Sequence, residues 1–505
     1  MGKRVLSVMI KITASIFLSV SCLIAQQGHV FVKAAPSGPQ ISTTLSGWTD
    51  IPDMSMIIDQ MHPGNVSIGF SAEAFTGGTQ RMFVRALVDD QPSNPPDVVF
   101  TLNSFTGTNS FRFSTNIASG QHEVKIQWLV DAGGTAYMGD RTMFVVTAPG
   151  IVNTIAAPSG PDVTTTSSSF TDIPDLIYTV NFPETGHAVI TIAGEVETSD
   201  NARMFVRALV NDQVSSPSDV VFTLGPYSST KEFTFVKTDL PAGNQLMHLQ
   251  WLVDAGYTAY LGDRTFTIGF SGPDAFTAGM GGIKSVSAPS GPFVTTTSID
   301  WSDIPDLNVP VSVPENAMLV VSLTAEAYSS AGKRMFVRAL IGDEVMEPSD
   351  VVFATEIWNG THGFHFVKEN VPPGNPVIHL QWLVDGGGTA SLGDRNMTVI
   401  GFPAVSTAVK EKIHSLQPET TILEQNYPNP FNMSTKFRYT LSKTGHVIVR
   451  VYDLKGGLVR ELVNSTMSQG SHEAVFNASG LPSGIYLIRV ETGNTVGTRK
   501  IVLQK

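Results

Sequence analysis

The sequence predicts an all-β protein, in which three tandem antiparallel β-sandwich or jelly-roll repeats precede a small immunoglobulin-like β-sandwich. Several motifs recur three times in the same order at nearly constant spacing, which indicates a triplicated module. Within each module, short runs of alternating apolar and polar residues are separated by Gly, Pro, Asn and Asp. No segment after the leader keeps a 3.6-residue apolar period. Roughly seven or eight short strands at this spacing are typical of an antiparallel sandwich or jelly roll.

The first residues have the pattern of a secretory signal peptide over residues 1–25. Lys3 and Arg4 precede an apolar run over residues 12–24, which the small residue Ala25 follows. The run is too short for a comfortable membrane span, so we predict cleavage near Ala25 and export of the mature chain. A retained membrane anchor and lipid attachment at Cys22 are the alternatives.

Composition excludes several classes of protein. The chain of 505 residues is 42% apolar and 15% charged, with a formal net charge of −12. Enough apolar residues are present to bury cores, so extended disorder is not expected. A nucleic-acid partner is not expected either, because it requires clustered Lys and Arg, which we do not find. Cys22 is the only cysteine, so a mature chain without the leader has no disulfide and no cysteine chemistry.

The three repeats are predicted over residues 34–149, 156–272 and 287–403, with a linker over 404–420. Each repeat is longer than a solenoid unit and long enough for its own core. Two motifs set the correspondence between the repeats. The motif RMFVRAL begins at Arg81, Arg203 and Arg334, and the motif QWLVD begins at Gln127, Gln250 and Gln381.

Alternation assigns the two faces of these motifs. In the first repeat, Met82 and Val84 lie on a wholly apolar face, which we predict to be core. The tryptophan of QWLVD falls on the apolar face of its own strand in every repeat. We therefore predict that Trp128, Trp251 and Trp382 fill the three cores and do not stack on sugars.

The opposite face of the RMFVRAL strand is the candidate interaction face. In the three repeats it consists of Arg81, Phe83 and Arg85, then Arg203, Phe205 and Arg207, then Arg334, Phe336 and Arg338. If the RMFVRAL and QWLVD strands are neighbours, Arg85 can pair with Asp131 across them. Three interpretations follow: an ordinary surface ion pair, a packing surface between repeats or chains, and an anion or acidic-polysaccharide site.

Three strands of each repeat carry a loose resemblance to a known jelly-roll class. They are the FVRALVDDQ strand, a later strand that ends in LQWLVD, and a closing strand of the type TAYLGDRTFTI. In this respect each repeat resembles the modules of the tumour-necrosis-factor and complement globular-head type. Those modules are typically trimeric. The resemblance therefore implies that three tandem copies form a pseudo-trimer within one chain.

The last part of the chain, residues 421–505, is predicted to be a separate small antiparallel domain. Strands are expected at about 435–441, 446–454, 471–477, 484–491 and 495–503. Pro428 and Pro430 fix an extended lead-in before the first strand.

Several motifs in this segment identify it further. They are the sequence from Tyr427 to Asn432, the VYDLKGG turn, the sequence ASGLPSGIY and a basic, apolar end. The segment resembles the type A C-terminal sorting domain of the type IX secretion system of Bacteroidetes. The resemblance implies export across the outer membrane, and an ordinary immunoglobulin-like module is the alternative. The residues that match the sorting signal are Pro428, Asn429, Pro430, Phe431, Asn432, Gly484, Tyr486 and Lys500.

Signals for catalysis, cofactors or metals are weak. No nucleophile elbow, HExxH helix, phosphate-binding loop or dinucleotide fingerprint is present. The histidines do not occupy equivalent places in the repeats, so we predict surface positions for them, with a two-ligand metal site at His362 and His365 as the alternative. The recurring acids, among them Asp50, Asp97 and Asp140, are scattered singly, which disfavours calcium and a glycosidase carboxylate pair. We expect no metal, no cofactor and no enzyme activity.

These observations predict an exported, non-enzymatic surface or extracellular protein with a structural or adhesive role. Its expected partners are the type IX secretion machinery and either cell-surface polysaccharide or further copies of itself. The alternative is a secreted carbohydrate-binding protein with one site in each repeat.

Overall fold

The computed structural model describes residues 28–404 and 422–504, in two compact units. The gaps in these ranges are residues 36–39, 61, 103–105, 149–150, 159, 161, 273–280, 289–290, 356–359, 424–425, 427–428, 430, 442–444, 454–456, 468–469 and 493–494. One unit ends at Ala404 and the other begins at Val405. The described residues form strands and turns, and none of them forms a helix that could cross a membrane. The predicted leader and most of the predicted linker lie outside the described residues.

The first copy of the repeat is a sandwich of two antiparallel sheets. Its inner sheet has the order β1–β10–β4–β8, with β2 paired to β10, and its outer sheet joins β3, β9 and β5, with β6 and β7 paired to β5. The strands are β1 (His29–Ala34), β2 (Ile41–Thr43), β3 (Thr49–Gln60), β4 (Gly64–Thr76), β5 (Met82–Val88), β6 (Gln91–Pro92), β7 (Val98–Thr101), β8 (Gly107–Ile117), β9 (Gly120–Val130) and β10 (Ala136–Thr147).

The second and third copies repeat this topology. Copy 2 contains β11 (Val152–Ala156), β12 (Val163–Thr165), β13 (Thr171–Phe182), β14 (Gly186–Thr198), β15 (Arg203–Val210), β16 (Gln213–Val214), β17 (Val220–Leu224), β18 (Ser229–Leu240), β19 (Gly243–Val253) and β20 (Ala259–Ser271). Copy 3 contains β21 (Gly282–Ser287), β22 (Val294–Thr296), β23 (Ser302–Pro310), β24 (Ala317–Ser329), β25 (Met335–Ile341), β26 (Glu344–Val345), β27 (Val351–Ala354), β28 (Gly360–Val371), β29 (Val377–Val384) and β30 (Ala390–Pro403). In each copy a first strand (β1, β11 or β21) begins before the start of the predicted repeat.

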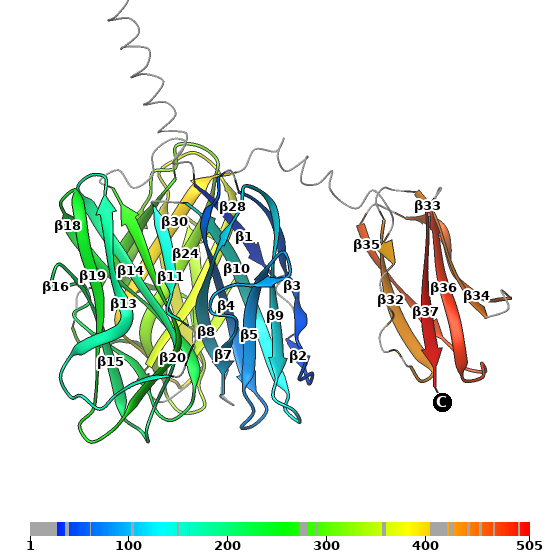
Figure 1. Cartoon of the computed structure of the whole chain (residues 1–505), viewed down its shortest axis with the longest axis horizontal. Helices are drawn as coiled ribbons and strands as arrows, with labels where there is room; N and C mark the ends of the chain where they lie inside the picture. Colours follow the sequence, from blue (N-terminus) through cyan, green and yellow to red (C-terminus); the bar gives the residue numbers. More distant parts are fainter. Residues whose placement is uncertain are drawn as a thin grey trace, which may run out of the picture. The chain divides into compact units, whose positions relative to one another are not determined.

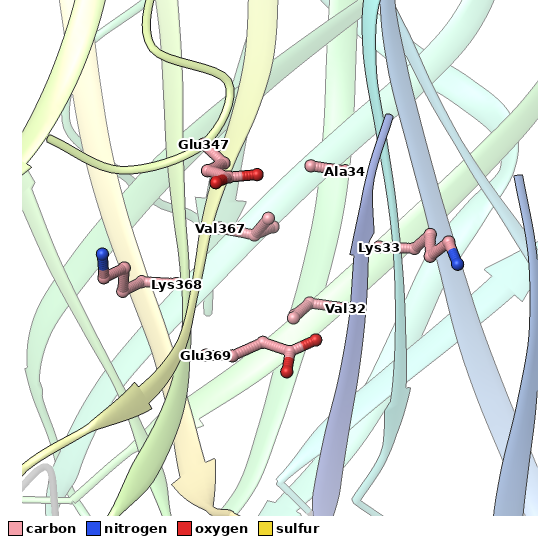
Figure 2. Close-up of a pocket in the computed structure, with 7 residues that line it drawn as sticks. All are labelled: Val32, Lys33, Ala34, Glu347, Val367, Lys368 and Glu369. Atoms are coloured by element: carbon pink, nitrogen blue, oxygen red, sulfur yellow. The ribbon is translucent and has the colours of Figure 1, made fainter. Parts of the chain in front are cut away.

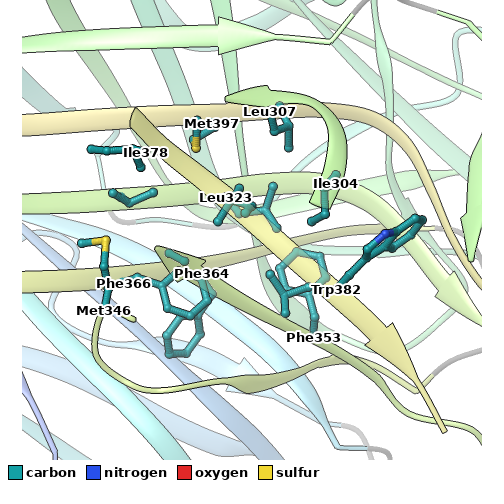
Figure 3. Close-up of a cluster of buried hydrophobic side chains, with 14 of the residues drawn as sticks. Ile304, Leu307, Leu323, Met346, Phe353, Phe364, Phe366, Ile378, Trp382 and Met397 are labelled. Carbon is teal, nitrogen blue, oxygen red and sulfur yellow. The ribbon is translucent and has the colours of Figure 1, made fainter. Parts of the chain in front are cut away.

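Each copy buries its own apolar core between its two sheets. In copy 3 the core combines Trp382 with Phe353, Phe364 and Met397 (Figure 3). Trp128, Trp251 and Trp382 are 3%, 1% and 2% exposed, so the prediction that they fill the cores is confirmed. Alternation along the strands places these rings inward, and burial of such large side chains is the main source of stability for sandwiches without disulfides.

The three copies form one body, which we call the head (Figure 1). Strands β8, β18 and β28, one from each copy, each contact the other two. An apolar cluster joins all three copies around these strands, and it includes Val30, Phe144, Val189, Val320 and Phe402. The tandem copies therefore form a pseudo-trimer within one chain, as the resemblance to trimeric jelly rolls implied.

One hydrogen bond recurs around the head and closes it. Thr108 Oγ1 of copy 1 donates to the Phe353 carbonyl of copy 3 at 3.2 Å. Thr230 Oγ1 of copy 2 donates to Phe100 of copy 1 at 3.3 Å, and Thr361 Oγ1 of copy 3 donates to Phe222 of copy 2 at 2.9 Å. Because each copy donates to one neighbour and accepts from the other, the three copies are related by a pseudo-threefold arrangement.

The C-terminal unit is a second, smaller sandwich. Its sheets have the orders β31–β32–β35 and β34–β33–β36–β37. The strands are β31 (Ile422–Leu423), β32 (Ser434–Leu441), β33 (Gly445–Asp453), β34 (Leu458–Met467), β35 (Gly470–Asn477), β36 (Gly484–Thr492) and β37 (Thr495–Leu503). The five predicted strands are present within one or two residues, and β31 and β34 were not predicted. The core includes Phe437, Tyr439, Val449 and Ile488.

Candidate functional site

The outer face of each copy carries an ion pair at the edge of the β5–β9 pairing. Arg81 Nε lies 2.9 Å from Asp131 Oδ2, and the side chains are 50% and 34% exposed. The equivalent pairs are Arg203 with Asp254 at 3.0 Å and Arg334 with Asp385 at 2.9 Å. The hydrogen bond to Asp131 raises the pKa of Arg81, and Arg81 lowers the pKa of Asp131. Such exposed pairs contribute about 0.2–1 kcal/mol.

The predicted pairing of Arg85 with Asp131 is wrong, and the strand register explains why. In the antiparallel β5–β9 ladder Arg85 lies opposite Gln127. Arg85 therefore donates from Nε and Nη2 to Gln127 Oε1 at 2.9 and 2.7 Å. Gln127 in turn donates to Asp50 Oδ1 at 2.7 Å. The sequence locates both strands but does not set their register, which decides the partner.

An aromatic ring covers the second arginine of each outer face. The Arg85 guanidinium lies 4.3 Å from the Trp48 ring centroid. Phe170 takes the same place under Arg207 at 4.0 Å, and Trp301 under Arg338 at 4.4 Å. Burial lowers the pKa of Arg85. In each copy, the aromatic ring thus contacts the second arginine of the same copy. This cation–π contact stabilises a half-buried guanidinium.

The outer faces are not the surfaces through which the copies pack together. Packing between copies runs mainly through β8, β18 and β28 of the inner sheets, and β7, β17 and β27 of the outer sheets contact the neighbouring copy as well. Arg81 reaches the boundary between copies 1 and 2, where it lines a pocket of about 310 Å³ together with Glu195, Glu197 and Tyr260. Three outer faces with the same arginine, phenylalanine and arginine side chains thus remain on the head, one per copy.

A glutamate lies at each boundary between two copies: Glu326 is buried, and Glu73 and Glu195 are half-buried. The carboxylates of Glu73, Glu195 and Glu326 accept the backbone N–H groups of Val352, Val99 and Val221, respectively, each of which belongs to a neighbouring copy. We call these three residues the seam glutamates.

The surroundings of the seam glutamates favour their neutral form. Burial, assisted by the charges of Asp140 and Asp350, raises the pKa of Glu73 to about 7 although the Val352 N–H opposes this shift. Burial with Asp263, Asp162 and Asp97 likewise raises the pKa of Glu195 to about 7, against the Val99 N–H. Two carboxyl groups at these boundaries therefore titrate near neutral pH.

The combined substitution Glu73→Gln/Glu195→Gln is expected to change the pH dependence of stability. A raised carboxyl pKa contributes stability that is complete below about pH 4.5 and is lost as the pH rises through about 7. The variant, whose amides accept the same N–H groups, should match the wild-type protein at pH 5 and melt a few degrees higher at pH 8. Thermal unfolding at both pH values measures this. Glu369→Gln, at an exposed position, is the control, and an equal difference at both pH values would refute the prediction.

A second pocket lies where copy 1 meets copy 3. It has a volume of about 390 Å³ and lies between β1, where Val32 and Ala34 line it, and β28, where Val367 lines it. Figure 2 shows the carboxylates of Glu347 and Glu369 turned toward the space between the strands, and the amines of Lys33 and Lys368 turned away from it. Because two copies build its walls, this pocket exists only when the head is closed.

The prediction of surface positions for the histidines is wrong for three of them. His248, His362 and His365 are 6%, 2% and 0% exposed. His248 lies 2.8 Å from Asp172 across the outer sheet, whereas the other two lie on β28 between the copies. Burial lowers the pKa of His362 and of His365. No group of three or more potential metal ligands occurs among the described residues.

The C-terminal sandwich holds the predicted signal residues around its last strand. The Phe431 N–H donates to the Val502 carbonyl at 2.9 Å, and the Phe431 ring is 1% exposed. Asn429 Oδ1 accepts the Val502 N–H at 2.9 Å. The chain segment before β32 is thereby fastened to β37. Pro428 and Pro430 lie outside the described residues.

The other signal residues lie on or beside β36 and β37. Tyr486 is buried, and its hydroxyl donates to the Pro482 carbonyl at 2.8 Å. Gly484 begins β36, Lys500 lies on an exposed part of β37, and Asn432 is exposed. Some signal residues, such as Phe431 and Tyr486, therefore help to hold the sandwich together. Others, such as Asn432 and Lys500, lie on its surface.

The fold and these contacts define a β-sandwich cargo head that carries an appended C-terminal sandwich. Residues 425–504 match the family model described as a secretion system C-terminal sorting domain. The C-terminal sandwich is a sorting domain of the type IX secretion system, and it directs the chain to export from the cell. The recognition made from its motifs is confirmed.

Other comparisons are weaker. No curated protein matches the chain. Among solved structures, the CARDB domain of a Pyrococcus furiosus protein, in complex with di-metal ions, is 16% identical, covering 17% of this chain and 90% of that chain with a TM-score of 0.14. The CBM36-1 domain of a xylanase from the Trinervitermes trinervoides hindgut metagenome is 16% identical, covering 24% and 98% with a TM-score of 0.16. At such TM-scores these likenesses carry no functional argument.

Proposed function

We propose that the protein is a non-enzymatic structural or adhesive protein of the outer cell surface or the extracellular space. The signal peptide with cleavage near Ala25 brings the chain to the periplasm, the sorting domain takes it across the outer membrane, and the head then binds. The single observation that carries this proposal is the threefold repetition of one outer face on a closed head.

The repeated outer faces support binding because packing does not require their identity. The inward residues of β5, β15 and β25 repeat because they fill equivalent cores. The outward residues repeat as well, although the strands that carry them are not those that make the main contacts between copies. Three equal faces held on one rigid body increase apparent affinity for a surface with many equal sites, because later contacts are intramolecular.

The nature of the face favours a polar, uncharged or mixed-charge partner. Arg81 is matched by Asp131, and the Arg85 amide partner Gln127 is bound to Asp50. The face therefore offers planar guanidinium and phenylalanine surfaces with little net charge. This argues for cell-surface polysaccharide or protein over a strongly anionic polymer.

Removing the first arginine of all three faces tests the proposal. The variant Arg81→Ala/Arg203→Ala/Arg334→Ala should lose at least tenfold in binding of the labelled secreted protein to cells of the producing strain. A control variant, Lys33→Ala/Lys237→Ala/Lys284→Ala, removes three positive charges elsewhere and should bind as the wild type does. Equal binding by both variants would refute a role of the outer faces.

A glycan array with the mature protein distinguishes the remaining alternative. Saturable binding of one oligosaccharide at three sites per chain would favour the carbohydrate-binding function. Cleavage of any bound glycan would overturn the assignment as non-enzymatic.

A further inference from the structure

The strands at the centre of the head combine repeated residues with residues that differ. On β8, β18 and β28 the core-facing phenylalanines are the same in every copy: Phe111, Phe233 and Phe364, then Phe113, Phe235 and Phe366. The two positions that alternate with these phenylalanines are also buried, but each holds three different residues: Ser110, Glu232 and Gly363; Arg112, Thr234 and His365. The sequence differences between the copies are thus concentrated on the side where the three strands meet.

Three of these residues form a buried polar cluster with one member from each copy, the axial triad. Arg112 Nε donates to Glu232 Oε1 at 2.8 Å, and their side chains are 3% and 0% exposed. His365 Nε2 lies 3.5 Å from Glu232 Oε2 and its side chain is 0% exposed. Burial opposes the charge of Glu232, but Arg112 and His365 outweigh it and lower the pKa of this carboxyl.

The surroundings hold the triad in place. The second ring nitrogen of His365 lies 2.8 Å from Ser322 Oγ of its own copy. The Arg112 guanidinium lies 5.2 Å from the centroid of the Phe144 ring. The hydrogen bond from Arg112 to Glu232 Oε1 satisfies one carboxylate oxygen, whereas Glu232 Oε2 and His365 Nε2 face each other without a hydrogen bond.

Side-chain size is complementary as well as charge. A Cβ atom at Gly363 would lie 2.4 Å from Ser110 Oγ and 3.6 Å from Glu232 Cβ. The third copy has glycine at this level because copies 1 and 2 fill the space. A strand β18 placed at all three positions would bring three Glu232 side chains into the same volume.

We propose that the axial residues act as a recognition code through which each copy selects the two other kinds of copy. In a head made of three identical copies, each axial residue would face itself. Three Arg112 or three Glu232 side chains would then bury like charges without partners, which is strongly unfavourable. The mixed head, in contrast, pairs arginine with glutamate and glutamate with histidine. The buried side of β8 therefore fits β18 and β28 together. Only a head that contains one β8, one β18 and one β28 pairs the axial side chains.

With this code, the head contains one copy of each kind. The tandem linkage brings the three copies together, and the axial code excludes two copies of the same kind from one head. The head consequently carries its three outer faces in a defined order. Neither step depends on what the outer faces bind.

Charge exchange in the full-length protein tests the code. The single variants Arg112→Glu and Glu232→Arg each place like charges together in the buried centre, and we expect the melting temperature to fall by about 5 °C. X-ray scattering should show a larger radius of gyration, because the three copies separate. The double variant Arg112→Glu/Glu232→Arg restores an opposite-charge pair between the same two copies and should recover at least half of the lost melting temperature.

An exposed pair of the same chemistry serves as the matched control. Arg81→Glu and Asp131→Arg reverse the outer-face pair, and each should lower the melting temperature by no more than about 1 °C. If the single axial variants do not fold at all, recovery of folded monomer by the double variant is the supporting result. A double variant no better than the single variants, or single variants as stable as the wild type, would overturn the code.

Discussion

Deletion of residues 421–505 is expected to leave the protein in the periplasm, with essentially none outside the cell. The deleted segment is the sorting domain, and the head is a separate compact unit that ends before it. The physical basis is that the export machinery must recognise a folded surface, which this β-sandwich presents and the head does not carry. Immunoblots of periplasm, outer membrane and culture medium measure the distribution.

Two control proteins distinguish loss of the export signal from misfolding of the head. A head fragment should be as resistant to protease as the head of the full-length protein, which shows that retention is not caused by misfolding. Fusion of residues 421–505 to an unrelated periplasmic reporter should send the reporter out of the cell. Appearance of the truncated protein in the medium at wild-type amounts would contradict the assignment of this domain as the export signal.

Replacement of Trp251 by alanine is expected to destabilise the head by about 3–5 kcal/mol. Trp251 is 1% exposed and belongs to the set of largest fully buried side chains. It lies opposite Val206 on β15 and opposite Thr171 on β13, so its loss leaves a cavity beneath the centre of the outer sheet of copy 2. The cost is high because the surrounding sheets cannot close over a void of this size.

Urea or thermal unfolding of the full-length protein measures this change. Trp128→Ala and Trp382→Ala should behave alike, since their rings occupy the equivalent cores. Tyr227→Ala, which removes a ring that is 61% exposed, should change the free energy of unfolding by no more than about 0.5 kcal/mol. A tryptophan variant that loses less than about 1 kcal/mol would show that these rings do not support the cores.

Strand β34 illustrates where the sequence pattern was insufficient. The other main strands of the sorting domain alternate clearly, and their predicted ranges agree with the structure. Residues 458–467 form a strand at the edge of the sheet, and none of them is fully buried. Apolar residues of β34 pack against the core, but two register shifts in its pairing with β33 break the two-residue alternation on which strand prediction depends.

The outer face shows a different limit. Its residues and their direction were predictable, because alternation along one strand is a local property. The pairing of Arg85 was not, since the register of two strands more than 40 residues apart depends on the packing of both. One step in register would have exchanged Gln127 for another neighbour.

The sequence by itself determined the three copies, their inward-facing tryptophans and the identity of the sorting domain, because repetition, alternation and motif spacing are properties of the chain read in order. Only the tertiary structure decided that Arg112, Glu232 and His365 meet. These residues alternate with phenylalanines and look like an ordinary solvent-facing row, yet they are buried. Their neighbours come from strands more than a hundred positions away, and no local pattern records which residues a closed head brings into contact.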